Sequence, residues 1–522
     1  MSKFFYLGLF FSFPLILFSQ KCELKVLGRV QEVNCLDPIP FANVYFKEAE
    51  IGAVCDEKGF FEIPPICQGS FHVAVSHIGC KTREFYITVS RDTTMFLKIE
   101  QFSQIMDELA IAATATEEPT TQPLMHLDAH EISQYSDKNM ANMLDNLAGV
   151  STIKNGNNIA KPVVNGLYGD RLILLNNGVT QSGQQWGADH SPEIDPLAVG
   201  KITVIKGVSA LAYQGSNLGS AILVSPPKID SEPHLHGSAR YFFESNGLGN
   251  GLNIRVQKHH QKFAWSMMGT AKKKGDSRAA SYFLTNTGAV EGDFAVQAEY
   301  NHNSSLKSKL FFSSFNANYG VLRGAHIGNL ADLEEALVKG EPFYTEDYFS
   351  YQINAPFQKV NHHLLKWETV FLINEDHKFD FTHAVQWDLR KEFDVRRAGR
   401  SLRPALSLNQ TSNFTELKYK GYLSDGWEVS SGFQSNLMNN FNESGTGILP
   451  LIPDYNSNRL GIFILAAKKN QQFNFELGGR YDYLDQRVAT ITRGIVKEIK
   501  RYHSNVSNIG LAGGARYIFS NG

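Results

Sequence analysis

The sequence predicts a mainly β protein in which a small β-sandwich and a mixed α/β domain precede an antiparallel transmembrane β-barrel. The chain has 522 residues, which is enough for several domains. From about residue 232 onward, apolar and polar residues alternate, so each strand has one apolar and one polar face. After the N-terminus no apolar run reaches the roughly 18 residues of a membrane-spanning helix, whereas barrel strands interleave apolar residues with polar ones.

The composition excludes several classes of protein. Lys and Arg number 50 and Asp and Glu 52, a balance without the basic excess of nucleic-acid-binding proteins, so we expect no nucleic-acid partner. Hydrophobic residues make up 43% of the chain, too many for a disordered protein. The patterns G-x-S-x-G, H-E-x-x-H and the P-loop are missing, and His130-Glu131 lacks the second His of a zinc protease. We therefore expect no catalytic residues, no enzymatic activity and no required cofactor.

Residues 1–19 have the pattern of an export signal. Lys3 supplies a positive start, Phe4 to Phe18 form an apolar stretch, and Ser19 is small. At about 15 residues the stretch suits a signal core and is too short to span a bilayer. The sequence therefore predicts a protein that leaves the cytoplasm.

Residues 20–100 are predicted to form the β-sandwich. Short runs rich in β-branched and aromatic residues, such as Phe41 to Phe46 and Phe71 to Ser76, are separated by turn signals such as residues 56–59. All the cysteines fall before residue 81: Cys22, Cys35, Cys55, Cys67 and Cys80. An exported protein can form disulfides, but an odd number of cysteines leaves at least one thiol without an internal partner, and the pairing stays open.

Residues 101–125 are predicted to be a linker of small and polar residues. Within it, two acids precede a short apolar run in the segment Asp107, Glu108, Leu109, Ala110, Ile111, Ala112 and Ala113. One interpretation of this segment is an isolated β-strand. The other is a segment that adds as a strand to the sheet of a periplasmic partner. Its position between two domains favours the second interpretation.

Residues 126–228 are predicted to mix helix and strand. Apolar residues recur at helical spacing from Met140 to Leu147, and a glycine ends the pattern, which predicts an amphipathic helix. Short apolar runs at 172–175 and 201–205 predict buried strands.

Residues 229–522 are predicted to form barrel strands. Between Phe379 and Phe393 the odd positions are apolar except for His383 and Lys391, and most even positions are polar. In a soluble sandwich the apolar face would point inward, whereas in an outer-membrane barrel it faces lipid. The length of the strands, the 12% aromatic content and the export signal favour the barrel.

The order of these regions resembles that of a TonB-dependent outer-membrane receptor with an N-terminal carboxypeptidase-regulatory-like domain. The sandwich is similar to that domain at Gly28-Arg29-Val30, Ile39 to Val44, Asp56 to Phe61 and His77 to Cys80. The mixed region resembles the plug domain of the family at Leu144 to Val150, Asp170 to Val179, Ile202 to Gly207 and Ala210 to Ser216. The chain departs from the pattern of the family at Asn165, Thr203, Lys206 and Ser220, where Arg, Glu, Arg and Gly are usual.

The resemblance implies a transporter in the outer membrane of a Gram-negative bacterium, with the barrel in lipid and the N-terminal domain in the periplasm. The plug would fill the barrel, and Asp107 to Ala113 would be the TonB box that contacts the TonB–ExbB–ExbD energy-coupling complex. A pull on this box would rearrange the plug and admit a scarce nutrient. Barrels of this family have about 22 strands, roughly twice what residues 229–522 can form, so we expect about a dozen strands, an unclosed sheet and an incomplete chain.

The predicted substrate site is a polar segment between two plug strands, Gln184 to Asp195. Its imidazole and carboxylates suit zinc and other borderline divalent metals. Asp189-His190 also resembles the acid-His pair in the plug loop of the zinc-uptake branch of the family. The predicted ligands of a metal or other substrate are Asp189, His190, Glu193 and Asp195. The alternative is an ordinary solvated or plug-packing loop.

Barrel residues would have to complete such a site, because two adjacent ligands cannot make a tetrahedral one. The candidates are His326, His362 and His363, although adjacent strand residues point to opposite faces, so His362 and His363 are not expected to share an ion. We expect the transported species to be Zn²⁺ or a metal chelate, such as siderophore-bound iron or haem. A carbohydrate or peptide importer and a non-transporting surface-binding barrel are the alternatives.

Overall fold

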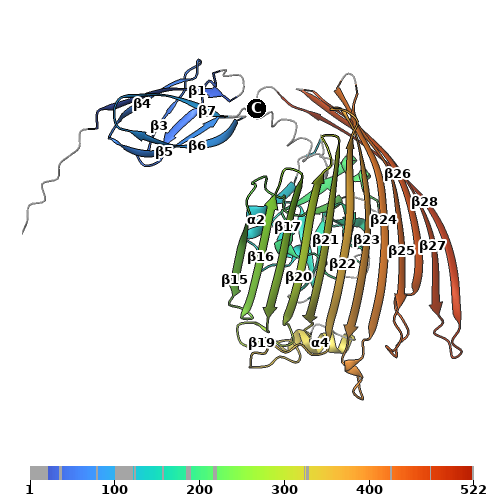
Figure 1. The fold of residues 1–522 in the computed structure, drawn as a ribbon. Coiled ribbons are helices and arrows are strands. Elements are labelled where there is room, and N and C mark those ends of the chain that lie inside the picture. Colours follow the sequence, from blue (N-terminus) through green and yellow to red (C-terminus); the bar gives the residue numbers. More distant parts are fainter. Residues whose placement is uncertain are drawn as a thin grey trace, which may run out of the picture. The chain divides into compact units, whose positions relative to one another are not determined.

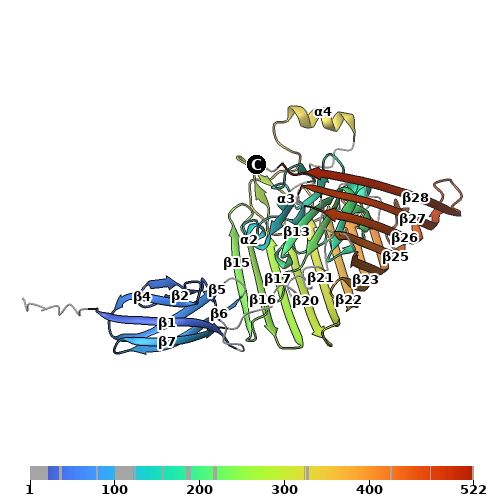
Figure 2. The same cartoon turned by 90° about the horizontal axis from the view of Figure 1, so that it is seen from above.

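The computed structural model, drawn in Figure 1 and Figure 2, divides into two units, Met1–Thr114 and Ala115–Gly522, which are described separately. It describes residues 22–33, 38–77, 80–99, 121–122, 125–155, 158–183, 190–214, 220–322, 324, 329–423, 426–470 and 472–519. The predicted export signal and TonB box lie outside these residues. Within the described ranges, no helix combines the length and the apolar character needed to cross a membrane.

The first unit is a β-sandwich, as predicted. Its described strands are β1 Leu24–Glu32, β2 Asn43–Phe46, β3 Ile51–Val54, β4 Phe60–Ile66, β5 Gly69–His77, β6 Cys80–Val89 and β7 Thr93–Ile99. They form one sheet in the order β4-β1-β7 and another in the order β3-β2-β5-β6. Alternate residues such as Val44 and Phe46 enter an apolar core that both sheets share, whereas Asn43 and Tyr45 are exposed.

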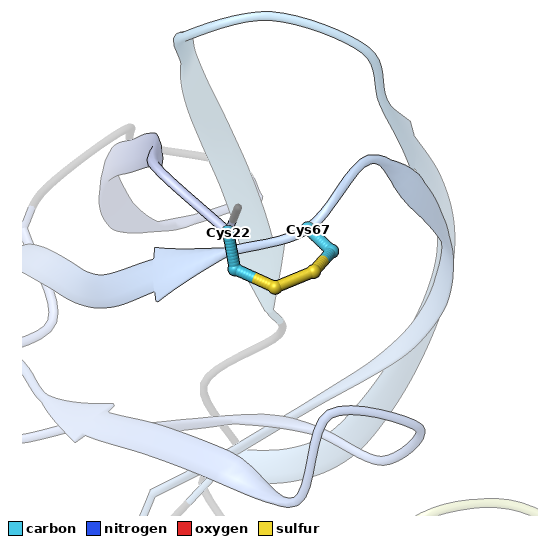
Figure 3. The surroundings of a disulfide bond; sticks show 2 residues. All are labelled: Cys22 and Cys67. Carbon is cyan, nitrogen blue, oxygen red and sulfur yellow. A yellow bond between two sulfur atoms is a disulfide. The ribbon is translucent and has the colours of Figure 1, made fainter. Parts of the chain in front are cut away.

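A disulfide between Cys22 and Cys67 ties the start of β1 to the turn between β4 and β5 (Figure 3). It supplies a pairing that the spacing of the cysteines left open. Cys55 is buried and Cys80 is half-buried, and both carry free thiols. Cys35 lies outside the described residues.

The second unit begins with the plug. Its described elements are β8 Met125–Asp128, α2 Ala129–Ser133, α3 Met140–Leu144, β9 Val150–Asn155, β10 Ile159–Val164, η1 Gly169–Arg171, β11 Leu172–Asn176, β12 Val179–Thr180, η2 Pro196–Ala198, β13 Lys201–Lys206, η3 Gly207–Ala212 and β14 Ser220–Ser225. The main sheet has the order β12-β11-β14-β13-β8, and β9 pairs with β10. The strands predicted at 172–175 and 201–205 are confirmed as β11 and β13.

The predicted plug helix is present but shorter than its apolar pattern. We expected it to run to Leu147, whereas α3 ends at Leu144. Just beyond this end, the Asn146 side-chain Nδ2 donates to the Met143 carbonyl over 2.8 Å. Asn competes in this way with backbone hydrogen bonds, which explains why the helix stops before the pattern does.

The rest of the second unit is a large antiparallel sheet. In the described part of the chain it has twelve strands in sequential order, with β15 and β28 at its edges, which agrees with the expected dozen strands and unclosed sheet. The strands are β15 His236–Glu244, β16 Gly249–His259, β17 Phe263–Lys274, β20 Ala289–Asn301, β21 Leu306–Gly320, β22 Phe357–Leu372, β23 His377–Phe393, β24 Leu406–Tyr422, β25 Trp427–Asn442, β26 Asp454–Lys469, β27 Phe473–Ile491 and β28 Ile499–Tyr517.

The connections between these strands differ at the two ends of the sheet. The turn from His259 to Phe263 is short, and so are the turns after β20, β22, β24 and β26. The opposite end carries longer connections with elements of their own: β18 Ser277–Arg278, β19 Phe283–Leu284, α4 Leu330–Val338 and η5 Arg400–Leu402 (Figure 1). Outer-membrane barrels have short turns on the periplasmic side and longer loops outside, so the two ends can be told apart.

The sheet buries its polar face and exposes its apolar face, which decides against the soluble sandwich. In β23 the even residues Asp388 and Arg390 are 2% and 1% exposed, whereas the adjacent odd residue Trp387 is 42% exposed. Figure 2 shows why: the sheet curves around the plug elements α2, α3 and β13. The plug covers the polar face, and the apolar face is left for lipid.

We predict that the disulfide stabilises the sandwich. Changing both Cys22 and Cys67 to Ser should lower the free energy of unfolding of this unit by about 2–4 kcal/mol, because the open chain gains entropy when unfolded. Hydrogen exchange of the β1 and β4 amides in the whole protein would measure the change. Cys80→Ser is the control and should leave protection nearly unaltered; equal protection in the double variant would contradict the prediction.

Candidate functional site

The predicted substrate segment runs along the inner face of the large sheet. It follows β12 and precedes η2, and its described residues begin at His190. His190, Glu193 and Asp195 are each less than 10% exposed and contact strands of the wall, whereas Asp189 lies outside the described residues. In this conformation the segment is therefore an interface between plug and wall.

Glu193 is the centre of this interface. Its Oε1 accepts a hydrogen bond from Arg390 of β23, and its Oε2 lies 2.6 Å from His362 Nδ1 of β22. Arg390 Nη1 also donates to Gln358 Oε1 over 3.0 Å. Burial acts to raise the pKa of Glu193, but Arg390 and His362 lower it more, so its pKa lies below the usual value and the carboxylate is charged.

His362 faces hydrogen-bond acceptors at both ring nitrogens. Glu193 faces Nδ1, and Gln386 Oε1 lies 3.1 Å from Nε2. The orientation of the Gln386 amide is fixed because its nitrogen donates to the Thr180 carbonyl over 3.0 Å. Two acceptors favour the doubly protonated imidazolium, which neutralises part of the buried negative charge. His363 is half-buried against Ser314, so the two adjacent histidines do point to opposite faces, as predicted.

Asp388 adds a second carboxylate to this cluster. One carboxylate oxygen of Asp388, one of Glu193 and a ring nitrogen of His362 lie within 4.8 Å of one another, and all three residues are buried. Within the described residues, Asp388 Oδ1 has no hydrogen-bond partner. Gly183 of the plug, at φ +78°, approaches Asp388 so closely that a side chain there would clash with Oδ2. The donor set of one imidazole and two carboxylates is one that zinc accepts.

The other two predicted residues bind the wall on either side of Glu193. His190 Nε2 lies 3.1 Å from Glu392 Oε1, and burial lowers the pKa of His190, with Arg390 lowering it further. Asp195 accepts from Leu197 N over 3.0 Å, which caps η2, and from Thr270 Oγ1 of β17 over 2.6 Å. The segment is thus held by β17 at one point and by β22 and β23 at another, with β20 and β21 between them in the sheet.

Further polar ties hold other parts of the plug. Lys366 Nζ donates to the Asn177 carbonyl over 2.8 Å, Arg480 Nη1 to the Leu211 carbonyl over 3.0 Å, and Gln434 Nε2 to the Ala212 carbonyl over 2.8 Å. Of the wall residues at the site, only His362 was predicted from sequence, and the candidate His326 lies outside the described residues. The alternation of polar and apolar residues in β23 predicts that Gln386, Asp388 and Arg390 point inward. It does not predict which plug residue each of them contacts.

The interface leaves little room beside Glu193. A cavity of about 30 Å³ is lined by Glu193 and Asp195 of the plug and by Asp293 and Phe315 of the wall, among others. This volume suits about one water molecule rather than a metal chelate. A larger substrate would therefore require the plug or its loops to move.

Comparisons with known proteins agree with this architecture. Residues 26–111 match the family model of the CarboxypepD_reg-like domain, and residues 116–221 match that of the TonB-dependent receptor plug domain. The TonB-dependent receptor SusC of Bacteroides thetaiotaomicron is 22% identical over 351 residues, which cover 64% of this chain and 34% of SusC. The chain thus spans about a third of this relative.

Solved structures share the fold at low sequence identity. The closed form of the ferric-catecholate import receptor Fiu from E. coli K12 has a TM-score of 0.59 at 12% identity, covering 77% of this chain and 64% of Fiu. The ferric yersiniabactin uptake receptor FyuA from Yersinia pestis has a TM-score of 0.56 at 11% identity, covering 78% and 64%.

These features define an antiparallel β-sheet of the barrel type that encloses a plug domain. The chain carries a plug domain of the TonB-dependent receptor type, preceded by a CarboxypepD_reg-like domain, and its second unit shares the fold of the solved receptors.

We predict that Arg390 holds the plug against the wall. Arg390→Ala leaves the buried Glu193 carboxylate without its main counter-charge, which should weaken plug seating by about 3–5 kcal/mol. Hydrogen exchange of residues 190–199 in the whole protein would report the loss as faster exchange.

A matched control is Arg487→Ala, because the Arg487 side chain is 72% exposed and should contribute little. Glu193→Gln combined with Arg390→Met should recover much of the protection, since neither partner is then charged. Equally slow exchange in Arg390→Ala and the wild type would contradict the assigned role.

Proposed function

We propose that the chain is an outer-membrane importer that takes up a scarce nutrient by energy-coupled rearrangement of its plug, and that the nutrient is a metal ion or a metal chelate. The observation that carries the proposal is the polar contact between plug and wall. Glu193, Asp195 and His190 meet charged or hydrogen-bonding partners on the strands rather than an apolar core. Such contacts exchange with water at modest net cost, so the plug can leave the wall.

Energy for this movement would come from TonB–ExbB–ExbD in the periplasm. The segment Asp107 to Ala113 precedes the plug in the sequence and has the two acids and short apolar run expected of a TonB box. It would bind by adding a strand to the partner's sheet. The first plug strand, β8, lies at the edge of the plug sheet, where a pull from the linker would act first.

The chemistry of the buried cluster supports a metal as the cargo. Glu193, His362 and Asp388 supply two carboxylates and an imidazole around one point, and His190 has a pKa below its usual value. A neutral imidazole is the form that ligates a metal. With its proton lost, His362 would add a second nitrogen ligand, so plug movement and cargo binding would compete for the same groups. Asp189 belongs to this proposal as a further ligand.

A carbohydrate importer of the same architecture is the second candidate. It is favoured by aromatic side chains in the long connection between β21 and β22, where Tyr344 is 56% and Tyr348 is 64% exposed. Exposed aromatic rings with a polar hydroxyl offer flat, amphipathic contact surfaces of the kind that sugars pack against. Uptake measurements with both kinds of cargo separate the two candidates.

We predict that deleting Asp107 to Ala113 abolishes uptake and leaves binding of the cargo unchanged. The segment would contact the energising partner and not the ligand, so only the transport step should fail. Cells that produce the full-length protein and the deletion variant would be compared for uptake and for surface binding of radiolabelled zinc, ferric chelates and glycans. Undiminished uptake in the deletion variant would remove the TonB-box assignment.

We also predict a zinc-specific role for the plug segment. His190→Ala should reduce zinc uptake by at least about 10-fold, the lower bound for lost metal-site groups, with Asp189→Asn intermediate and Ser191→Ala least affected. Iron-chelate and glycan uptake in the same cells is the control. If all three cargoes fell together, the segment would act in plug seating alone, and an effect on glycan uptake only would favour the second candidate.

A further inference from the structure

The connection between plug and barrel carries a second group of metal-ligating side chains. It joins the end of β14 at Ser225 to the start of β15 at His236. Within it, ligand-type residues occupy four alternate positions: Asp230, Glu232, His234 and His236. In an extended chain alternate side chains lie on one side, so this pattern gathers them on one face.

The side chains are close enough to share one ion. His234 Nε2 lies 3.1 Å from Glu232 Oε2, and His236 Nε2 lies 3.3 Å from Asp230 Oδ2. Ligand atoms of Glu232, His234 and His236 all fall within 4.8 Å of one another. At Zn–N and Zn–O distances of about 2.0–2.1 Å, tetrahedral ligands lie about 3.3–3.4 Å apart. The two nitrogen–oxygen pairs already have nearly this separation.

The ring of His236 is oriented as a metal ligand requires. Its Nδ1 lies 3.0 Å from the His234 carbonyl oxygen, which can only accept, so Nδ1 carries the proton. Nε2 faces the Asp230 carboxylate, which is also an acceptor, so an ion bound at Nε2 would replace a proton there. A histidine that donates one ring N–H to a backbone carbonyl and offers the other nitrogen is the usual arrangement at metal sites. Gln257 Nε2 also lies 2.9 Å from His236 Nε2 and would have to move away when an ion binds.

The group is open to solvent and lies at a defined end of the sheet. The side chains of Glu232 and His234 are 62% and 66% exposed, so an ion can reach them from solution. His236 pairs with Gln257 near the short turn that follows β16. Short turns mark the periplasmic end of outer-membrane barrels. This place is distinct from the buried cluster around Glu193.

We propose that Asp230, Glu232, His234 and His236 form a zinc site at the junction of plug and barrel. Two imidazoles and two carboxylates suit zinc and, in competition with it, other borderline divalent metals such as copper, rather than magnesium or calcium. The ion would tie this connection to β16. Arg255 of β16 already contacts the connection, because its Nη2 donates to the Lys228 carbonyl over 2.5 Å. The site does not depend on the cargo that the protein imports.

The test is metal binding by the whole protein in detergent, followed with Co²⁺ as a spectroscopic probe and Zn²⁺ as competitor. The wild type should give the absorption bands of tetrahedral Co²⁺, which Zn²⁺ abolishes and Mg²⁺ does not. His234→Ala combined with His236→Ala should lose at least about 10-fold in affinity, and Glu232→Gln should lose less. His302→Ala is the matched control, because His302 lies in another short turn and contacts Ser308.

A local measurement separates this site from the buried cluster. Zinc should slow hydrogen exchange of residues 228–244 in the wild type and in His190→Ala, and should not slow it in the double histidine variant. Unaltered Co²⁺ spectra and affinity in the double variant would overturn the proposal. So would an equal loss of affinity in His302→Ala, because binding would then be spread over surface histidines.

Discussion

The structure depends on a sheet that turns its polar face inward. Because lipid takes the apolar face, the wall that surrounds the plug is lined with charged and amide side chains, and the plug has to meet them with partners of its own. This constraint explains why Glu193 lies between Arg390 and His362, and why backbone carbonyls at Asn177, Leu211 and Ala212 accept from wall side chains. Among the described residues, apolar contacts between plug and wall form patches around Val179 and around Val208.

Ionic contacts of this kind fix position more than they add stability. Burying Glu193 and Arg390 removes both from water, and their attraction roughly offsets that cost, so the pair contributes little net free energy while each partner alone is strongly unfavourable. The same balance makes the plug sensitive to any change that neutralises or competes for one member. A cation bound by Glu193 and Asp388, or loss of the His362 proton, would redistribute the charge that holds the plug segment.

Much of the fold follows from the sequence, and less of the site does. The alternation from Phe379 to Phe393 predicted which side chains of β23 turn inward, and the opposite facing of adjacent strand residues separated His362 from His363. It could not predict that Glu193 meets Arg390, because that contact depends on how far the plug is inserted and on the register of the sheet. The apolar pattern also did not predict the end of α3. The Asn146 side chain bonds to the backbone there, and the helix ends before the apolar residues do. The segment from Asp107 to Ala113 lies outside the described residues, so its role is a prediction from sequence alone.

The plug has a core of its own, which bears on how it can move. Leu144, Ile202, Val204 and Ile222 pack in a buried cluster made of plug residues, separate from the wall contacts. Loss of the polar contacts between plug and wall would therefore release the plug without unfolding it. Within its sheet, however, β8 is an edge strand that pairs with β13 over Met125 to Asp128, so it is bound on one side. If the proposed partner pulls on the preceding linker, the force would separate this short strand from β13 before it reached the core, so the proposal implies partial unfolding at β8 as the first step of plug rearrangement.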